Sequence, residues 1–516
     1  MLQIRNLTIT YNKDRRVLLD DFSLTLNSGD KAALIGEEGN GKSTLLKWIA
    51  DPELISDYAE ARGIRTVTGE RIGYLPQELP EEDREKTVYA YLSEEERFTE
   101  QTPKDLARLA ARMKLPADMF YSDQKLATLS GGEKVRIQTA RILMKDPTVL
   151  LLDEPSNDLD IAMLEWTEQL IREFRGAVLF ISHDEILIEN TANRIVHLEL
   201  LNRKTVCRHT IVNTGYREYM ERRSDLYDRQ MQKAMSERRE EAERMERFRR
   251  IQQRVDHELN SVSRQDPHSG RLLKKKMQSV KSMEKRFERE RENMTRIPQQ
   301  EEAILFFFGE ESRIPYGKKI LDLSLKELKI EENVLARDIV LQISGPQKVC
   351  IIGRNGCGKS TLLKKIREEL KERTDIRCAY MPQEYTDLLE MDQTPVQYLA
   401  PDMDRESVTR VRNLLGSMRY TTDEMEHPIR ELSGGQKAKI FFLKMNLEHA
   451  NVLILDEPTR NFSPLSQPVI RSVLKEFGGT IISVSHDRRY IAETTDTVFE
   501  LTENGLRKLK GNDISG

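Results

Sequence analysis

The 516-residue sequence lacks any long apolar run. Its uninterrupted apolar stretches, such as residues 303–308 and 149–152, are much shorter than the about 20 apolar residues that a membrane-spanning helix needs. The N-terminus alternates apolar and polar residues, which is typical of a strand and not of a secretion signal. We therefore expect no membrane-spanning segment, no signal region and no membrane partner.

Cysteine is scarce, and its spacing excludes two common kinds of site. The four cysteines match neither a zinc-binding pattern nor a disulfide framework. They are Cys207, Cys350, Cys357 and Cys378. We expect reduced thiols and a cytoplasmic protein.

The chain as a whole has little net charge, because 82 Lys and Arg residues oppose 86 Asp and Glu residues. Residues 220–300 are different: they hold 22 basic and 15 acidic residues, a net charge of +7. The rest of the chain then carries −11, since the total is −4. A basic segment between acidic portions is expected of a segment that binds a polyanion. A solvated helical face explains the charge equally well, so charge alone leaves both interpretations open.

Five short motifs occur twice, in the same order, which indicates two copies of one domain. Residues 36–43, 74–77, 129–132, 153–155 and 182–184 recur as residues 353–360, 380–383, 432–435, 456–458 and 485–487. The last three pairs are separated by 303 positions and the first pair by 317. The first copy is therefore longer between its first two motifs.

Each copy begins with a phosphate-binding loop. An apolar stretch runs into G-x-x-x-x-G-K-S and then into a helix with apolar periodicity, and this context makes the motif specific. Backbone N–H groups of such a loop surround a phosphate at a helix N-terminus. We expect Lys42 and Lys359 to reach the β- and γ-phosphates, and the hydroxyls of Ser43 and Ser360 to hold Mg²⁺.

A second apolar stretch in each copy ends in Asp-Glu. Asp153 and Asp456 suit direct or indirect coordination of Mg²⁺, and Glu154 and Glu457 can orient and polarise the attacking water. An isolated Asp-Glu pair after a strand is often structural. Here it follows a phosphate loop in both copies, which favours the hydrolytic role.

The Leu-Ser-Gly-Gly motif at residues 129–132 and 432–435 is absent from ordinary phosphate-loop NTPases. Together with the Gln and His motifs it is similar to the ATP-binding cassette superfamily. The resemblance implies an α/β fold with two phosphate-loop cassettes in tandem. It also implies that the cassettes meet head to tail within one chain, with each nucleotide between one phosphate loop and the opposite Ser-Gly-Gly.

The resemblance assigns residues to two composite ATP sites. Site one would combine Lys42, Gln77, Glu154 and His183 with Ser433, Gly434 and Gly435, and site two Lys359, Gln383, Glu457 and His486 with Ser130, Gly131 and Gly132. The implied catalytic residues are Glu154, Glu457, His183 and His486. Further implied ATP contacts are Tyr11, Gly36, Gly39, Gly41, Ser43, Thr44, Gly353, Asn355, Gly356, Gly358, Ser360 and Thr361. The implied Mg²⁺ ligands are Ser43, Gln77, Asp153, Ser360, Gln383 and Asp456. Tyr11 would stack on adenine, whereas alignment places Leu328 at that position of the second cassette.

Tandem cassettes without membrane domains, joined by a long charged helical segment, are similar to the ABC-F class. The resemblance implies a first cassette at residues 1–216, a linker at 217–300 and a second cassette at 301–516. It also implies a monomer that enters the bacterial 70S ribosome and extends its linker towards the peptidyl-transferase centre, near 23S rRNA and P-site tRNA. Neither DNA nor a membrane would be a partner.

Two departures from the class pattern resemble its antibiotic-resistance branch, which protects ribosomes against lincosamides, pleuromutilins and streptogramin A. Glu38 occupies a position where Asn is usual, and Ser463 occupies the position of Asp160 in the first cassette. The interval from Gln77 to Ser130 is 53 positions and that from Gln383 to Ser433 is 50, which leaves no room for the extra helical arm common in the housekeeping branch.

The linker is expected to be an antiparallel helical hairpin. Residues 217–260 lack Pro and Gly and favour continuous helix, residues 266–270 indicate a turn, and helix resumes from residue 272 to about residue 296. The helices would be roughly 65 Å and 40 Å long at 1.5 Å per residue. The expected apolar seam contains Leu226, Met231, Met245, Leu259, Met277 and Met283.

The linker tip is the most basic part of the chain. Residues 264–286 contain eight Lys or Arg and two acidic residues, a net charge of +6. Such a cluster gains affinity for structured RNA through phosphate contacts and counterion release. The residues expected to contact rRNA are Arg264, His268, Arg271, Leu272, Lys274, Lys275 and Lys276.

Three other functions fit parts of the sequence. A housekeeping ABC-F translation factor would share both cassettes and the linker. A transporter ATPase subunit can contain tandem cassettes, but a basic hairpin of about 80 residues has no evident task at a membrane. A coiled-coil DNA-maintenance ATPase usually inserts a much longer coil into a single cassette.

Overall fold

The computed structural model describes residues 1–156, 159–261, 267–292, 294–295, 297–298, 307–331 and 333–509. The chain divides into two compact units, one made of residues 1–216 with 301–516 and the other of residues 217–300. In the described ranges, no helix is long and apolar enough to cross a membrane.

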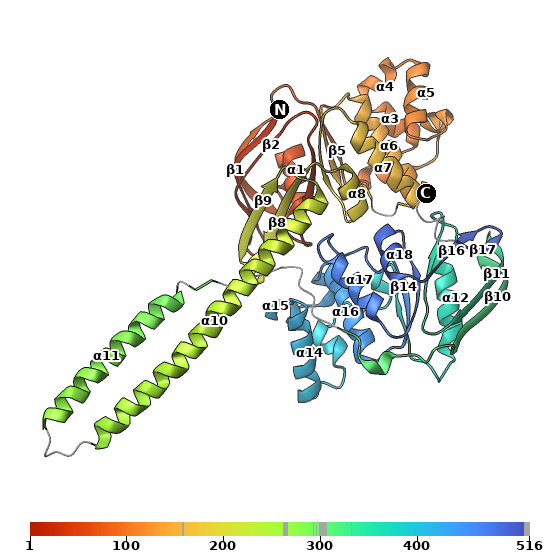
Figure 1. Cartoon of the computed structure of the whole chain (residues 1–516). Helices are drawn as coiled ribbons and strands as arrows, with labels where there is room; N and C mark the ends of the chain where they lie inside the picture. Colours follow the sequence, from red (N-terminus) through yellow and green to blue (C-terminus); the bar gives the residue numbers. More distant parts are fainter. Residues whose placement is uncertain are drawn as a thin grey trace. The chain divides into compact units, whose positions relative to one another are not determined.

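Each half of the first unit is built on a six-stranded sheet with a parallel core, which confirms the predicted α/β fold with two cassettes in tandem (Figure 1). The strand orders are β5-β6-β7-β3-β8-β9 and β13-β14-β15-β12-β16-β17, which are the same topology twice. The first sheet consists of β3 (Lys31–Ile35), β5 (Ile72–Leu75), β6 (Val149–Asp153), β7 (Ala177–Ile181), β8 (Arg194–Leu200) and β9 (Val206–Val212). The second consists of β12 (Lys348–Ile352), β13 (Cys378–Met381), β14 (Val452–Asp456), β15 (Thr480–Val484), β16 (Thr497–Thr502) and β17 (Gly505–Lys508).

The central strands are apolar because both of their faces are covered. All residues of β3, β6, β7, β14 and β15 are buried, as expected of parallel strands with elements packed on both sides. The predicted apolar stretches at residues 149–152 and 452–455 are therefore confirmed as core strands. Parallel pairing brings their carboxyl ends to one edge of the sheet, where the phosphate loops and Asp-Glu pairs lie.

Smaller antiparallel sheets accompany the main ones. They consist of β1 (Leu2–Tyr11), β2 (Val17–Leu26) and β4 (Ala59–Thr66) in the first cassette, and of β10 (Lys319–Ile330) and β11 (Asn333–Ser344) in the second. Strands β1 and β10 alternate buried and exposed residues over part of their length, so one face of each packs on the core.

The helices that follow the phosphate loop, Leu-Ser-Gly-Gly, Asp-Glu and Ser-His-Asp motifs recur in the same order in both cassettes. The α-helices of the first cassette are α1 (Lys42–Ala50), α2 (Glu81–Arg84), α3 (Val88–Ser93), α4 (Glu96–Glu100), α5 (Pro103–Arg112), α6 (Gly131–Met144), α7 (Ile161–Glu173), α8 (Glu185–Thr191) and α9 (Leu201–Lys204). Those of the second are α12 (Lys359–Lys371), α13 (Pro395–Leu399), α14 (Arg405–Ser417), α15 (Thr422–Glu426), α16 (Gly434–Leu447), α17 (Gln467–Glu476) and α18 (Arg488–Thr494). Between Gln77 and Ser130, an interval that the structure describes in full, the longest helix has ten residues, so the extra arm is absent as expected.

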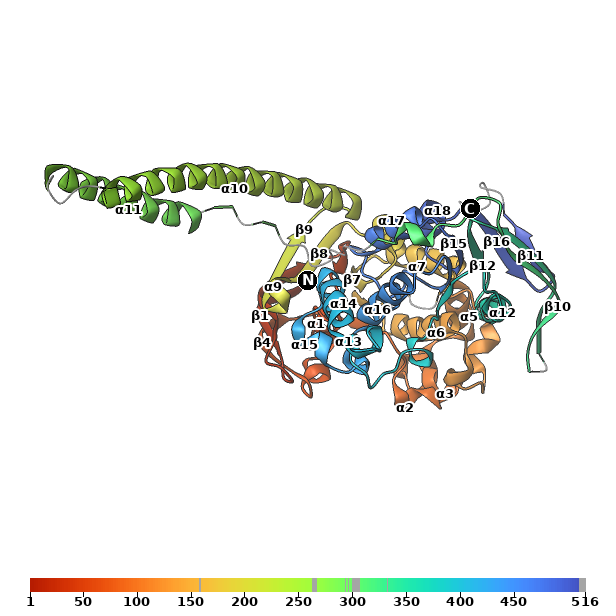
Figure 2. The ribbon, with the colours of Figure 1, turned by 90° about the horizontal axis from the view of Figure 1, so that it is seen from below.

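The second unit is a pair of antiparallel helices, as predicted (Figure 1, Figure 2). Helix α10 (Tyr216–Ser261) has 46 residues and α11 (Pro267–Glu292) has 26. Three contacts fix the register of the two arms: Glu237 with Thr295, just beyond α11, Glu241 with Arg291, and Glu258 with Lys276. Each step along α10 is matched by a step back along the other arm.

Two details of the predicted hairpin are wrong. Pro267 to Gly270 form the first turn of α11 and not a loop, because proline is well suited to the first position of a helix. The apolar seam is only partly as predicted: Met277 is confirmed, since it packs with Phe287 against the buried Phe248, Val255 and Val280. Leu226 and Met283 are 66% and 44% exposed, while Met231 and Met245 are only partly buried. The side chain of Leu259 lies outside the described part of the chain.

Candidate ATP sites

Both phosphate loops contain glycines in conformations that other residues rarely adopt. Gly36 has φ 146°, and a Cβ at this position would lie 2.2 Å from the carbonyl oxygen of Leu198. Gly41 and Gly358 take left-handed conformations immediately before α1 and α12. A side chain at Gly36 would displace the neighbouring strand, so this position requires glycine.

The loop lysines fold back over their own loops. Lys42 Nζ donates to the carbonyl oxygens of Gly36 and Glu37, both at 2.8 Å, and Lys359 Nζ donates to those of Gly353 and Arg354 at 2.8 and 3.0 Å. Each ammonium group is thus held against the backbone at the start of its loop. In this position it can exchange carbonyl partners for phosphate oxygens.

The Asp-Glu pairs lie beside the loop serines, at the ends of β6 and β14. Ser43 Oγ donates to Asp153 Oδ1 at 2.9 Å, and Tyr74 donates to the other oxygen at 3.4 Å. Burial raises the pKa of Asp153 to about 6, although the Ser43 hydrogen bond opposes that shift. Burial also raises the pKa of Asp456.

The residues present fit a Mg²⁺ ion bound together with a nucleotide. Asp456 Oδ1 is buried and accepts no hydrogen bond from any described residue. A buried carboxylate oxygen beside a serine hydroxyl supplies the hard oxygen ligands that Mg²⁺ requires. Ser43 with Asp153, and Ser360 with Asp456, would hold the ion, which would neutralise phosphate charge. Gln383 lines the same cavity as Ser360 and Asp456, whereas the side chain of Gln77 is exposed.

Glu154 and Glu457 share an unusual backbone conformation, with φ of 50° and 51°. Left-handed residues other than glycine are sparsely populated and collect at functional sites. The surroundings of the two carboxylates differ. Glu154 Oε1 lies 3.0 Å from His183 Nε2, whereas Glu457 accepts from the backbone N–H of His486 at 3.2 Å and its Oε1 lies 3.9 Å from the His486 ring.

The pKa values of the two histidines are shifted in opposite directions. His183 Nδ1 lies 2.8 Å from the carbonyl oxygen of Phe462, so both of its ring nitrogens face acceptors and both need a proton. Burial lowers the pKa of His183, but the Glu154 carboxylate outweighs burial and raises it above its usual value. Burial, assisted by Lys359, lowers the pKa of His486 to about 3. The surroundings of His183 thus favour its protonated form, and those of His486 favour the neutral form.

Burial and the adjacent Asp456 carboxylate raise the pKa of Glu457 to about 8. Such a carboxyl group is a stronger base than an ordinary glutamate once it has lost its proton. This property suits the predicted role of Glu457 in polarising the attacking water.

The two Leu-Ser-Gly-Gly motifs, here called the signature loops, end at helix N-termini. Ser130 caps α6 and Ser433 caps α16, each in a reciprocal capping box with the residue at the third helical position. The glycines that follow then present backbone N–H groups at the start of a 14-residue helix. Such a terminus favours an anion.

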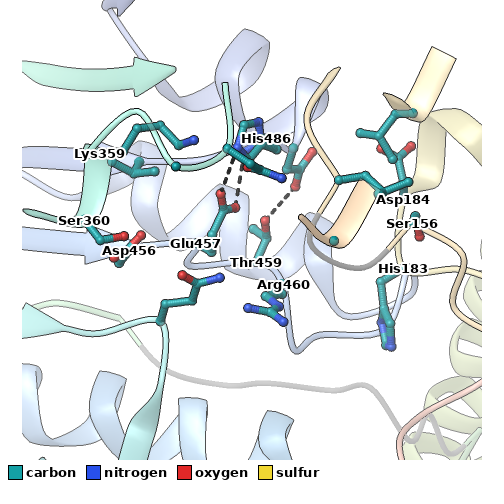
Figure 3. Close-up of a pocket in the computed structure, with 18 of the residues that line it drawn as sticks. Ser156, His183, Asp184, Lys359, Ser360, Asp456, Glu457, Thr459, Arg460 and His486 are labelled. Atoms are coloured by element: carbon teal, nitrogen blue, oxygen red, sulfur yellow. Dashed lines mark hydrogen bonds and ion pairs between the residues drawn. The ribbon is translucent and has the colours of Figure 1, made fainter. Parts of the chain in front are cut away.

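Predicted residues of site two come together around a cavity of about 530 Å³ (Figure 3). The close-up shows Lys359, Ser360 and Asp456 on one side of it and Ser156, His183 and Asp184 on the other. The first cassette contributes Ser130, Gly131, Ser156, Leu159, Leu164, His183 and Asp184. The second contributes Ile330, Asn355, Gly356, Gly358, Lys359, Ser360, Thr361, Gln383, Asp456, Glu457, Arg460 and His486, among others. Gly132 lies next to these residues in α6 but does not line the cavity.

Site one is organised by direct contacts between the cassettes. Glu38 Oε2 accepts from the backbone N–H of Gly435 at 2.8 Å. Glu37 accepts from the hydroxyls of Ser463 and Ser466. Glu38 and Ser463 are separate departures in the sequence, and neither partner could be predicted because Gly435 lies 397 positions from Glu38 and Glu37 lies 426 positions from Ser463.

The residues proposed for adenine differ between the sites. Tyr11 packs edge-on against Tyr58, with ring centroids 6.2 Å apart. Leu328 is 1% exposed and belongs to the core, whereas Ile330 lines the cavity of site two. Ile330 lies two residues further along β10, beyond a register irregularity between Leu328 and Lys329, so alignment by position selected the buried Leu328 instead.

Most residues predicted to contact RNA lie in the first half of α11. Leu272 is 52% exposed, and Lys275 and Lys276 are exposed. Arg264, and the side chains of His268, Arg271 and Lys274, lie outside the described part of the chain.

The family model described as "ABC transporter" matches residues 19–157 and 336–460, about half of the chain. The chain is 28% identical over 529 residues to the Ribosome protection protein VmlR of Bacillus subtilis, covering 98% of this chain and 88% of the relative. It is 25% identical to ABC transporter F family member 5 of Arabidopsis thaliana, covering 96% and 74%.

Among solved structures, an archaeal ribosome recycling factor, aABCE1, in complex with the ribosomal stalk protein aP1 matches with a TM-score of 0.62. The match covers 98% of this chain and 89% of that one at 17% identity, so it bears on the fold alone. The family model matches both cassettes, and each relative and the solved structure match nearly the whole chain. These matches agree with the repeated topology of the two cassettes.

Proposed function

Because the chain belongs to the ATP-binding cassette family, as an ABC-F ATPase with two cassettes, we propose that it is a ribosome-protection factor. In its ATP-bound, closed form it binds the bacterial ribosome. Its hairpin extends towards the peptidyl-transferase centre and displaces antibiotics bound there. Hydrolysis of ATP then permits release.

One observation carries this proposal: the segment between the cassettes is an antiparallel hairpin with a basic, exposed end. Lys275 and Lys276 are exposed near the start of α11, and Leu272 is exposed beside them. Phosphate contacts and shape dominate the recognition of structured RNA, and both suit a narrow helical pair with lysines at its tip. A relative over nearly the whole chain is named for ribosome protection, which supports the same function.

The role of ATP follows from linkage. A ligand shifts a conformational equilibrium only by its different affinities for the two forms. Both sites draw residues from both cassettes, so nucleotide bound there favours the form in which the cassettes are together. The hydrolytic glutamates end this state, and their removal prolongs it.

Ribosome co-sedimentation tests the switch. The Glu154→Gln, Glu457→Gln variant should pellet with ribosomes in ATP to a greater extent than the wild type, because it binds ATP but hydrolyses it slowly. Equal pelleting of variant and wild type would overturn the switch mechanism.

Growth inhibition tests the biological role. A drug-sensitive bacterium expressing the chain should resist lincosamides, pleuromutilins and streptogramin A, and the resistance should disappear in the double glutamine variant. Growth in macrolides and phenicols is measured as well, to show whether protection extends to these drug classes.

Lys275→Glu, Lys276→Glu should abolish resistance while ATP hydrolysis without ribosomes stays unchanged. The matched control is Lys233→Glu, Arg239→Glu, which makes the same charge change at exposed positions of α10 away from the tip. Ribosome binding without resistance to any drug would indicate a housekeeping translation factor.

A further inference from the structure

The two phosphate loops carry opposite charge. The first contains Glu37, Glu38 and Lys42, a net charge of −1, whereas the second contains Arg354 and Lys359, a net charge of +2. Glu37 corresponds in position to Arg354, and Glu38 to Asn355. A nucleoside triphosphate is a polyanion, so two carboxylates in a phosphate loop oppose its binding.

Both carboxylates of the first loop are engaged with the second cassette. Glu38 accepts from the N–H of Gly435 at 2.8 Å, at the N-terminus of α16. Its carboxylate also packs on the glycines of the signature loop: a Cβ on Gly434 would lie 3.3 Å from Oε1, and one on Gly435 would lie 3.5 Å from Oε2. Glu38 thus occupies the anion-binding end of this helix.

Glu37 makes a parallel set of contacts one residue earlier. Its Oε1 accepts from the hydroxyls of Ser463 and Ser466, the latter at 2.6 Å. Ser463 replaces the aspartate found at the matching position of the first cassette, Asp160. An aspartate here would face Glu37 with a like charge, so the serine and the loop glutamate are complementary.

The same place in site two is built differently. Asn355 and Gly356 of the loop, and Ser130 and Gly131 of the opposite signature, line the open cavity described above. Site two therefore leaves room between loop and signature for a phosphate group. In site one, loop carboxylates bridge directly to the opposite signature.

We infer that Glu37 and Glu38 form a carboxylate latch that takes the place of the γ-phosphate at site one. Site one closes without a γ-phosphate and accepts a nucleoside diphosphate as readily as a triphosphate. Site two remains the site at which the γ-phosphate governs closure. The inference concerns the ATPase sites and does not depend on the proposed action at the ribosome.

Nucleotide selectivity tests the latch. In full-length protein with site two disabled by Lys359→Ala, fluorescent ADP and ATP analogues should bind site one with similar affinity. The variant Glu37→Arg, Glu38→Asn, which copies the second loop, should bind the ATP analogue at least about tenfold more tightly than the ADP analogue. A variant that shows no preference for ATP, or a parent that already prefers ATP tenfold, would overturn the latch.

Hydrogen exchange provides a readout without nucleotide. In the nucleotide-free wild type, the peptide that contains Gly435 should be protected, and Glu37→Arg, Glu38→Asn should raise its exchange rate at least about tenfold. The matching peptide at Gly132 should not change.

The variant Glu37→Gln, Glu38→Gln removes only the charge. It replaces the first loop variant in both measurements if that variant folds poorly, and it should give a smaller change in the same direction. Glu81→Gln, Glu82→Gln removes two exposed carboxylates from the same cassette and should change neither readout. Unchanged exchange at Gly435 in both loop variants, or an equal change in the control, contradicts the inference.

Discussion

At the scale of single residues, Glu154 and Glu457 show how one backbone can hold two different bases. Both have a left-handed conformation after a buried strand. Glu154 is paired with a histidine whose pKa it raises, while Glu457 lies beside a histidine whose pKa is depressed to about 3. The sequence motifs are the same in both cassettes, so the difference arises from the residues packed around them.

Hydrolysis at site two should rise with pH. The pKa of Glu457 is raised to about 8, so at pH 7 most of this carboxyl group is protonated and cannot accept a proton. With site one disabled by Glu154→Gln, kcat/KM for ATP should increase almost tenfold between pH 6 and pH 7 and level off above pH 8. A flat profile measured by phosphate release over this range would contradict the role of Glu457 as the base.

Glu457→Gln should lower single-turnover hydrolysis at site two by about 10² to 10⁴, because a glutamine cannot accept the proton of the attacking water. ATP binding should persist, as measured by filter retention of labelled nucleotide. A matched change at the exposed Glu476, which lies at the end of α17, should leave the rate unaltered.

These residues were predicted from the sequence because phosphate binding requires particular residue types at fixed spacing. The phosphate loops, the Asp-Glu pairs and the signature loops could each be located on that basis. The pairing of Glu37 with Ser463 could not, because it depends on how two distant surfaces meet. Nor does a motif show that the pKa of His183 is raised while that of His486 is lowered.

At the scale of elements, the hairpin depends on a small apolar core. Phe248, Val255 and Val280 are at most 7% exposed, and Phe248 meets Phe287 edge-on with ring centroids 5.7 Å apart. The sequence predicted both helices, since neither contains an interior proline. Of the seam it predicted Met277 but not Phe248, Val255 or Val280, because methionine and leucine also occur on the solvated faces of a helix this rich in charge.

Phe248→Ala should destabilise the hairpin by about 3 kcal/mol, because it removes a buried aromatic side chain from a core with few other members. Hydrogen exchange of α10 and α11 in the full chain should accelerate, while the strands of both cassettes should exchange as before. Leu226→Ala is the control, since this side chain is 66% exposed and its loss should have no measurable effect. Equal exchange rates in the two variants would show that the seam lies elsewhere.

At the scale of the whole first unit, a buried ionic cluster joins the two cassettes. Arg471 on α17 and Glu185 on α8 are 3% and 2% exposed at their side chains and lie 2.6 Å apart. Arg488 and Arg489, at the start of α18, bind Glu168, Asp184, Glu185 and Glu189 of the first cassette. Nothing in the local sequence marks these residues, because their partners lie in the other cassette, about 300 positions away.

Arg471→Ala should lower the free energy of unfolding by about 3 kcal/mol, because Glu185 then loses a partner inside the protein. Replacing both residues, Arg471→Leu with Glu185→Leu, should recover part of the loss. Arg507→Ala breaks an ion pair with Glu500 that is far more exposed, 70% and 36%, and should cost less than about 1 kcal/mol. Urea denaturation of the full chain measures all three, and equal losses for Arg471→Ala and Arg507→Ala would show that burial of the cluster does not matter.

The antiparallel register of α10 and α11 also bears on how such a protein can diversify. Both ends of the hairpin are fixed by chain connectivity, so an insertion confined to one helix would break the pairing of Glu237, Glu241 and Glu258 with their partners. An insertion of seven residues into each helix keeps every pair in phase and lengthens the hairpin by about 10 Å. The length of the hairpin would therefore change by seven residues in each helix at a time, whereas the residues of the tip can be exchanged one at a time.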